Sequence, residues 1–458
     1  MTDDPRYARH TLVPGWDQAR LAAAQVILIG LGALGNEVAR ILALSGVGSM
    51  ILCDPDRVER SNVSRCALFR ESDCGKLKVE AAARALADLA PGCRLDARPQ
   101  TLIHGVGLAE LRDAALVIGC LDSRAARLQL AGRCNLMRAP MIDGGTHPWG
   151  GELRPYLDPD GPCYGCGLGE DARARTDTPW SCVEATELSG EGAAEGATAA
   201  ASVLIGGWMA MTALRHLLGL PVPPGLLQID GPAGTARRVQ QARDPDCPLH
   251  VPAGPVRRLP LGHTDTLGQL LAQLPPGAVP LAWAPVMEAL ECTNCDYRQT
   301  RWGLPPAPQS PGDAEVALAV LVTPLRGVTH VPAAPRPEPG PPRPPSGAAM
   351  TQGQDRVAAR ITLGPPAAAT SDTGRGAPGT GVTPRSGVTS PSGVTSPSGG
   401  TRAENVCPRC GAPLRPRTTL ELDRTPPDLT LAELGLAPRE VLAVRTAAGW
   451  DWVELDHG

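Results

Sequence analysis

A glycine-rich turn between a strand and a helix constrains the fold of this chain more than any other feature. Residues 30–35 read Gly-Leu-Gly-Ala-Leu-Gly and directly follow Gln25–Ile29, a short apolar run typical of a buried strand. Apolar residues then recur at helical spacing. Glycine at Gly30, Gly32 and Gly35 lets the backbone turn sharply and approach a phosphate, and the helix N-terminus adds N–H groups and a positive dipole. The turn predicts a nucleotide-binding α/β fold.

The first 250 residues alternate short apolar runs with helical patterns. This alternation is typical of βαβ units and a mostly parallel sheet, so we expect a Rossmann-like doubly wound fold. The expected elements are strands at Ser49–Cys53, 114–121 and 139–142, a helix at Lys78–Leu89, and antiparallel pieces at 151–157 and 226–238.

The composition changes sharply in the second half of the chain. Its 458 residues suggest about three domains, and many of its 52 glycines and 49 prolines gather between residues 332 and 402. A segment so poor in large apolar residues cannot offset its ordering entropy, so we expect a disordered insertion there. It would divide a C-terminal module into a first part at 255–325 and a second at 403–458, the latter with a helix capped by Thr430 and a strand at 450–455.

Charge and hydropathy argue against two classes of partner. The formal net charge is −4, without the strongly basic character of a nucleic-acid-binding domain. The N-terminus has no apolar run typical of a secretory signal. The uncharged stretch 197–214 is rich in Ala, Gly, Ser and Thr, which favours a buried helix over a membrane span. We therefore expect a cytoplasmic protein with neither nucleic-acid nor membrane partners.

Polar residues follow the predicted strands where a ligand of an open α/β sheet would bind. Asp54 ends the second strand about 20 residues after the glycines, where a carboxylate can bond ribose hydroxyls. Asp56, Asn62, Arg65 and Lys78 come next. Two cations and an amide so close to the glycine turn suit a triphosphate better than the pyrophosphate of a dinucleotide.

An acidic residue follows the strand expected at 114–121. Asp122 comes directly after Leu121, at the carboxyl edge of the sheet. A carboxylate there can hold Mg²⁺, which prefers one or two carboxylates together with phosphate oxygens.

Together these motifs resemble those of the ThiF/MoeB/HesA family of ubiquitin-activating-type adenylyltransferases. The resemblance covers residues 6–250 and includes the family's Arg-Tyr-x-Arg opening (Arg6 to Arg9), its glycine loop, Asp-x-Asp, Ser-Asn-x-x-Arg and Gly-x-x-Lys, in the family order. Ser123 departs from the pattern, because the family usually has Asn after the acidic residue.

The resemblance implies a mechanism and a role for each matched residue. Asp54 would bind the ATP ribose, Asn62, Arg65 and Lys78 the triphosphate, and Asp122 Mg²⁺, while Arg9 would reach the partner subunit of a homodimer. The C-terminal glycine carboxylate of a ubiquitin-like or sulfur-carrier protein would attack the α-phosphate and form an acyl-adenylate. Arg124 and Arg127, on the helix after Asp122, are expected to be surface charges.

Several functions remain open from the sequence. The acyl group could pass to a conjugating enzyme, which the appended C-terminal module favours, or to a sulfurtransferase in sulfur-carrier chemistry. Alternatives are adenylylation of a small-molecule or tRNA-linked carboxylate, a non-catalytic scaffold and an NAD-dependent oxidoreductase.

Eight metal-ligating residues fall into two sets with the spacing of Zn²⁺ chelates. Cys163 and Cys166 pair with Cys247 and His250, although the family usually has a cysteine in place of His250. Cys292 and Cys295, with Cys407 and Cys410, have the spacing of a zinc ribbon interrupted by the insertion. Such closed four-ligand sites are structural.

One further cysteine lies in a sequence of chemical interest. Cys182 follows Trp180 and Ser181 in a region that, in this family, crosses above the adenylate. Some members use a cysteine there to accept the acyl group as a thioester, since a thiolate readily attacks an acyl-adenylate. The sequence alone supports a catalytic and a non-catalytic cysteine equally.

Overall fold

The architecture described here comes from a computed structural model that describes residues 4–169, 196–305 and 406–456. These residues belong to one compact unit formed by Met1–Val331 and Asn405–Gly458. The predicted insertion and Cys182 lie outside the described residues.

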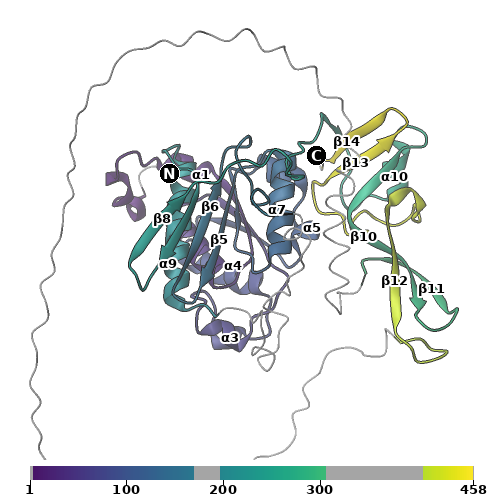
Figure 1. The fold of residues 1–458 in the computed structure, drawn as a ribbon, viewed down its shortest axis with the longest axis horizontal. Coiled ribbons are helices and arrows are strands. Elements are labelled where there is room, and N and C mark those ends of the chain that lie inside the picture. The colour runs from purple at the N-terminus through teal and green to yellow at the C-terminus, as the bar shows by residue number, and fades with distance from the viewer. Residues whose placement is uncertain (1–3, 170–195, 306–405, 457–458) are drawn as a thin grey trace, which may run out of the picture. The chain divides into compact units, whose positions relative to one another are not determined.

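The first half of the chain forms an eight-stranded sheet in the order β3-β2-β1-β4-β5-β6-β7-β8 (Figure 1). The strands β1 to β5 pair in parallel, and β6, β7 and β8 extend the sheet in antiparallel fashion. Their bounds are β1 Gln25–Ile29, β2 Ser49–Cys53, β3 Arg94–Arg98, β4 Leu116–Gly119, β5 Met141–His147, β6 Gly150–Tyr156, β7 Leu226–Asp230 and β8 Thr235–Val239.

Helices cover both faces of this sheet, as expected for a doubly wound fold. Alternate residues of β1 point to opposite sides, so Val26 and Leu28 belong to one apolar core while Ile27 and Ile29 belong to another. The first core includes residues of α2 (Ala33–Leu44), α4 (Lys78–Leu89) and α9 (Ala199–Leu217). The second includes residues of α5 (Leu102–Gly105), α6 (Leu108–Asp113) and α7 (Arg124–Met137). Short helices α1 (Gln18–Ala23) and α3 (Arg60–Val63) lie in the connections.

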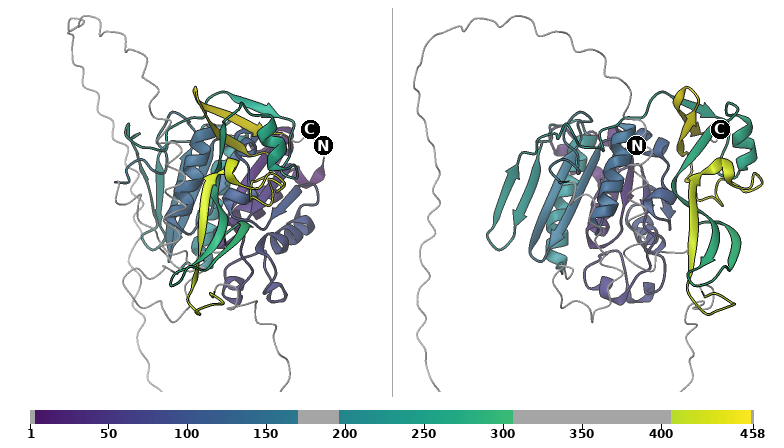
Figure 2. Two further views of the ribbon diagram at one scale, coloured as in Figure 1. Left: turned by 90° about the vertical axis from the view of Figure 1, so that its right-hand side faces the viewer. Right: turned by 45° about the vertical axis from the view of Figure 1, so that its right-hand side comes forward.

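The C-terminal module forms a second sheet in the order β11-β10-β13-β14-β9, with β12 also paired to β10. Figure 2 shows β12 lying beside the hairpin of β10 and β11. Segments before and after residues 306–405 therefore build one sheet. The bounds are β9 Val256–Leu259, α10 Leu267–Ala272, β10 Val279–Cys292, β11 Arg298–Gly303, β12 Leu414–Glu421, β13 Val441–Thr446 and β14 Gly449–Leu455.

The second sheet shares a core with the α5–α7 side of the first. One continuous apolar cluster contains Leu130 and Leu136 of α7 together with Val441 and Leu442 of β13. Within it, the side chains of Arg133 and Glu440 are 0% and 1% exposed, and their Nη2 and Oε2 atoms lie 3.1 Å apart. This buried ion pair links α7 to Glu440, the residue that precedes β13.

The predicted fold class is confirmed, and one local expectation is wrong. Thr430 accepts a hydrogen bond from the Glu433 N–H as a helix cap would, but residues 431–435 form turns instead of a helix. Residues 199–214 of the uncharged stretch lie in α9, which is buried on one side and exposes Val203, Leu204 and Met211 on the other. Within the described ranges, no helix has the length and apolarity needed to cross a bilayer.

Candidate functional site

The glycine turn connects β1 to α2 through three glycines with different surroundings. Gly30 has φ +91°, and a Cβ there would lie 2.4 Å from the Cys120 carbonyl oxygen. A Cβ on Gly35 would lie 2.0 Å from the Gly30 carbonyl oxygen, whereas one on Gly32 would meet nothing within 4 Å. Gly32 is the N-cap of α2. The turn is therefore tightly packed at Gly30 and Gly35 and open at Gly32, the N-terminus of α2, where an anion can bind.

Two aspartates after β2 lie against this turn. The buried Asp54 accepts hydrogen bonds from the Leu31 N–H (2.6 Å) and the Asp56 N–H (2.9 Å). Burial raises the pKa of Asp54, although Lys78 and the Leu31 N–H act against that rise. The Asp54 carboxyl group is thus fixed beside the glycine turn.

Lys78 lies at the start of α4 and interacts with the two aspartates Asp54 and Asp56. Its Nζ is 2.7 Å from Asp56 Oδ2, and its backbone N–H donates to the Asp56 carbonyl. Although Lys78 is only 8% exposed and burial opposes its charge, Asp54 and Asp56 outweigh that effect and raise its pKa. The ammonium group is therefore held charged and in place at the carboxyl edge of the sheet.

Asn62 and Arg65 lie on and just after the short helix α3. Asn62 is buried, and its Oδ1 accepts from the Glu59 N–H at 3.0 Å. The half-buried Arg65 donates from Nη1 to the Ser61 carbonyl. Burial raises the pKa of Cys66 to about 11, while Arg65 and Lys78 both oppose this rise, so the two cations share one neighbourhood.

Asp122 lies in the turn between β4 and α7, with its side chain exposed. Desolvation by the surrounding protein raises the pKa of Asp122, and the charge of Asp56 adds to this rise. The charges of Lys78 and Arg127 oppose it. The charges of Asp56 and Lys78 therefore act on the Asp122 carboxyl group. Ser123, the departure from the family pattern, accepts from the Ala126 N–H as the N-cap of α7.

The expectation for Arg127 is wrong. Its side chain is 14% exposed and pairs with the buried Asp143 of β5 (Nη1 to Oδ2, 3.1 Å). Its Nε and Nη2 both donate to the Leu121 carbonyl, at 3.1 and 2.8 Å. The position of Arg127 one turn into a helix suggested a surface charge, and no local signal identified the partner on β5.

Arg9 is exposed and lies between the 3₁₀ helices Pro5–Tyr7 and His10–Leu12. Its side chain makes no hydrogen bond or ion pair with another residue that the structure describes, so no contact links it to Asp56, Lys78 or Asp122.

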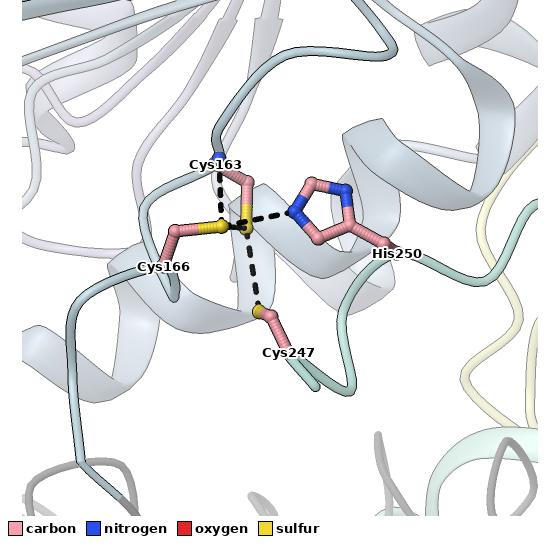
Figure 3. A group of neighbouring side chains, drawn as sticks. All are labelled: Cys163, Cys166, Cys247 and His250. Carbon is pink, nitrogen blue, oxygen red and sulfur yellow. Dashed lines mark hydrogen bonds between the residues drawn. The ribbon is translucent and has the colours of Figure 1, made fainter. Parts of the chain in front are cut away.

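The first predicted metal set comes together beside α7. The side chains of Cys163, Cys166, Cys247 and His250 point toward one another (Figure 3). The Sγ of Cys163 lies 3.8 Å from that of Cys166 and 3.7 Å from that of Cys247, and Cys166 Sγ lies 3.1 Å from His250 Nε2. Sulfur atoms bound tetrahedrally to Zn²⁺ are about 3.8 Å apart. The donor types and spacing fit Zn²⁺, with His250 as one of the four donors.

The second set joins the two parts of the C-terminal module at the end of β10. Sγ atoms of Cys292 and Cys410 lie 3.4 Å apart, and those of Cys295 and Cys407 lie 3.7 Å apart. All four ligand atoms fall within 4.8 Å of one another. This spacing also fits tetrahedral Zn²⁺, but Cys410 is exposed, whereas the three cysteines of the first set are buried.

Comparison with known proteins places this arrangement in a family. The model of the ThiF family matches residues 7–249, which include the glycine turn, both aspartates after β2, Lys78, Asp122 and the ligands of the first metal set up to Cys247. The chain belongs to the ThiF family.

Curated relatives match about half of the chain. "Adenylyltransferase and sulfurtransferase MOCS3" of Drosophila yakuba is 33% identical over 251 residues, which are 54% of this chain and 53% of the relative. The mouse protein of the same name (Mus musculus) is 32% identical over 246 residues, 53% of this chain and 51% of its own. The chain thus spans about half the length of the curated relatives it matches.

Among solved structures, Escherichia coli MccB with ATP is similar to part of this chain. It is 21% identical, covers 55% of this chain and 75% of its own, and has a TM-score of 0.44.

Proposed function

We propose that this protein uses ATP to adenylate the C-terminal carboxylate of a ubiquitin-like or sulfur-carrier protein. A carboxylate oxygen attacks the α-phosphorus of ATP, the bond from that phosphorus to the oxygen bridging to the β-phosphate breaks, and pyrophosphate leaves. The products are an acyl-adenylate and pyrophosphate. Membership of the ThiF family and the adenylyltransferase activity named for the relatives support this reaction.

One observation carries the proposal: a buried, charged Lys78 is fixed by Asp56 beside the open N-terminus of α2. A developing negative charge on the phosphates is stabilised most by groups that do not reorganise during the reaction. Lys78 meets this condition because its ammonium group is already held 2.7 Å from Asp56 Oδ2. In this assignment Asp54 binds the ribose, Asn62 and Arg65 contact the phosphates, and the protein aligns the two reactants without a strong base.

The charges at the site favour a divalent cation. Asp54, Asp56 and Asp122 outnumber Lys78 and Arg65, and a triphosphate would add further negative charge. Mg²⁺ binds through one or two carboxylates together with phosphate oxygens, and the exposed Asp122 offers such a carboxylate. We therefore assign Asp122 as the Mg²⁺ ligand; the bound ion would neutralise phosphate charge. Zn²⁺ in the two four-donor sets would stabilise the fold.

The relatives favour one route for the activated carboxylate. Their name includes a sulfurtransferase activity, which supports a sulfur-carrier partner more than transfer to a conjugating enzyme. Arg9, exposed and apart from the site, would serve the nucleotide of a partner subunit in a homodimer. The proposed thioester on Cys182 stays a prediction.

The test is exchange of radiolabelled pyrophosphate into ATP, with and without a glycine-ended carrier protein. We expect carrier-dependent exchange in the wild type. Lys78→Met and Asp122→Asn should lower its rate by roughly 100-fold, because each removes a group that stabilises charge at the phosphates. Lys76→Met is the matched control, since Lys76 lies two residues away and pairs with Asp73 instead.

Two outcomes would contradict the proposal. Exchange that survives both substitutions would refute the assigned site. Exchange that needs a small-molecule carboxylate in place of the carrier would support the alternative activity.

A further inference from the structure

The guanidinium of Arg127 connects the backbone next to Asp122 with the first metal set. Two of its N–H groups hold the Leu121 carbonyl, which is the peptide unit that leads into Asp122. A third N–H holds the buried carboxylate of Asp143. The fork of an arginine can make these bonds at once, whereas a lysine ammonium cannot match their geometry.

An aromatic ring from the metal-binding loop packs against the same guanidinium. The ring of Tyr164 lies between Cys163 and Cys166 in sequence, and its centroid is 6.0 Å from Arg127 Cζ. Arg154 of β6 lies 5.1 Å from the same ring but donates to Glu152 and not to Leu121. The Tyr164 ring thus contacts two cations, and of these two only Arg127 also bonds the Leu121 carbonyl.

The backbone of β5 leaves space for this arrangement. A Cβ at Gly145 would lie 2.7 Å from Arg127 Nη2, so a side chain at this position would displace the guanidinium. Arg127 and Gly145 also line a cavity of about 600 Å³ that continues over β6, β7 and β8. Arg127 therefore lies where the Asp122 turn, the cavity and the metal-binding loop meet.

We propose that Arg127 is a positioning residue for the Asp122 carboxylate and that Tyr164 transmits the geometry of the first metal set to it. The inference rests on the proposed function for the role of Asp122. Loss of Arg127 or of the Tyr164 ring frees the Leu121–Asp122 peptide, so the carboxylate is no longer held in the position that Mg²⁺ and ATP require.

The experiment measures Mg²⁺-dependent ATP binding by calorimetry and pyrophosphate exchange on the full-length protein. Arg127→Lys and Tyr164→Leu should each raise the Mg²⁺ concentration for half-maximal binding by about 10-fold, as is usual when a group that orients a metal ligand is removed. The zinc content and the KM for the carrier protein should stay near the wild-type values. Tyr164→Phe keeps the ring and should restore wild-type Mg²⁺ dependence, and Arg154→Lys is the matched control.

Other results would overturn the inference. Arg127 has only a structural role if Arg127→Lys leaves the Mg²⁺ dependence of ATP binding unchanged. The same conclusion follows if Arg127→Lys weakens Mg²⁺-dependent binding but also lowers thermal stability and zinc content. If Arg127→Lys fails to fold, the two Tyr164 variants test the inference instead. Equal Mg²⁺ dependence of Tyr164→Leu and Tyr164→Phe would then overturn it. A wild type that binds Mg²⁺ and ATP but lacks exchange would refute the proposed function and leave the positioning role intact, whereas a wild type without Mg²⁺-dependent ATP binding would refute both.

Discussion

At Gly32 and Gly35 the same added methyl group would meet opposite surroundings. Gly32→Ala places it in open space, so the free energy of unfolding should fall by no more than about 1 kcal/mol, the cost of a poorer N-cap. ATP affinity should nevertheless drop, because we expect the phosphates in that space. Gly35→Ala forces a methyl group against the Gly30 carbonyl and should lower the free energy of unfolding by at least about 2 kcal/mol.

Urea denaturation and ATP titration of both variants check this prediction. A Gly32→Ala protein with normal ATP affinity would show that the phosphates lie elsewhere.

The buried Asp143 gives the protein a pH dependence of stability. Burial raises the pKa of Asp143 to about 6, above the ordinary value of 3.8 for an aspartate, although Arg127 opposes the rise. The folded state therefore binds more protons between these values, and the resulting stabilisation is complete below about pH 3.8 and lost as the pH rises to about 6. The full effect is about 3 kcal/mol.

An asparagine at position 143 has nearly the shape of a protonated aspartate but does not titrate. The free energy of unfolding of the wild type, minus that of Asp143→Asn, should fall as the pH rises from 4.5 to 7.5 in urea titrations. A constant difference would mean that Asp143 titrates normally in the folded protein.

At the scale of elements, one buried ion pair, Arg133 with Glu440, links α7 to the residue that precedes β13. Glu440 accepts from Arg133 and from the Leu108 and Val441 N–H groups. Glu440→Gln would leave the Arg133 charge buried without a counter-charge, and we expect the free energy of unfolding to fall by about 3–5 kcal/mol. Asp451→Asn, an exposed change on β14, is the control for urea denaturation. Equal stability of the two variants would contradict the assigned role of the pair.

The elements themselves could be predicted well from local patterns. The apolar run of β1, the helical spacing of α4 and the glycine turn depend on residues close in sequence, so local patterns identified them. The partner of Arg127 lies 16 residues away on β5, and that of Arg133 lies 307 residues away. Such contacts depend on how elements pack, which no local pattern specifies. The turns after Thr430 show the same limit, since the predicted cap at Thr430 was not followed by a helix.

At the scale of the molecule, the two metal sets should differ in how readily they lose Zn²⁺. We expect two Zn²⁺ per chain by elemental analysis and one after Cys407→Ser. A chelator should remove Zn²⁺ first from the second set, because Cys410 is exposed and the cysteines of the first set are buried. Chelation assays on the wild type and Cys407→Ser check this order. Equal release from both sets, or one Zn²⁺ in the wild type, would contradict it.

The split module also determines where the chain can change in length. β11 and β12 both pair with β10, and the four sulfur atoms at its end join the halves on either side of residues 306–405. Each doubling of a loop costs only about 0.6 kcal/mol of closure entropy, so halving or doubling the stretch 306–405 would change the stability of this sheet by less than about 1 kcal/mol. Related genes could thus lengthen, shorten or exchange that stretch while inheriting the same ribbon.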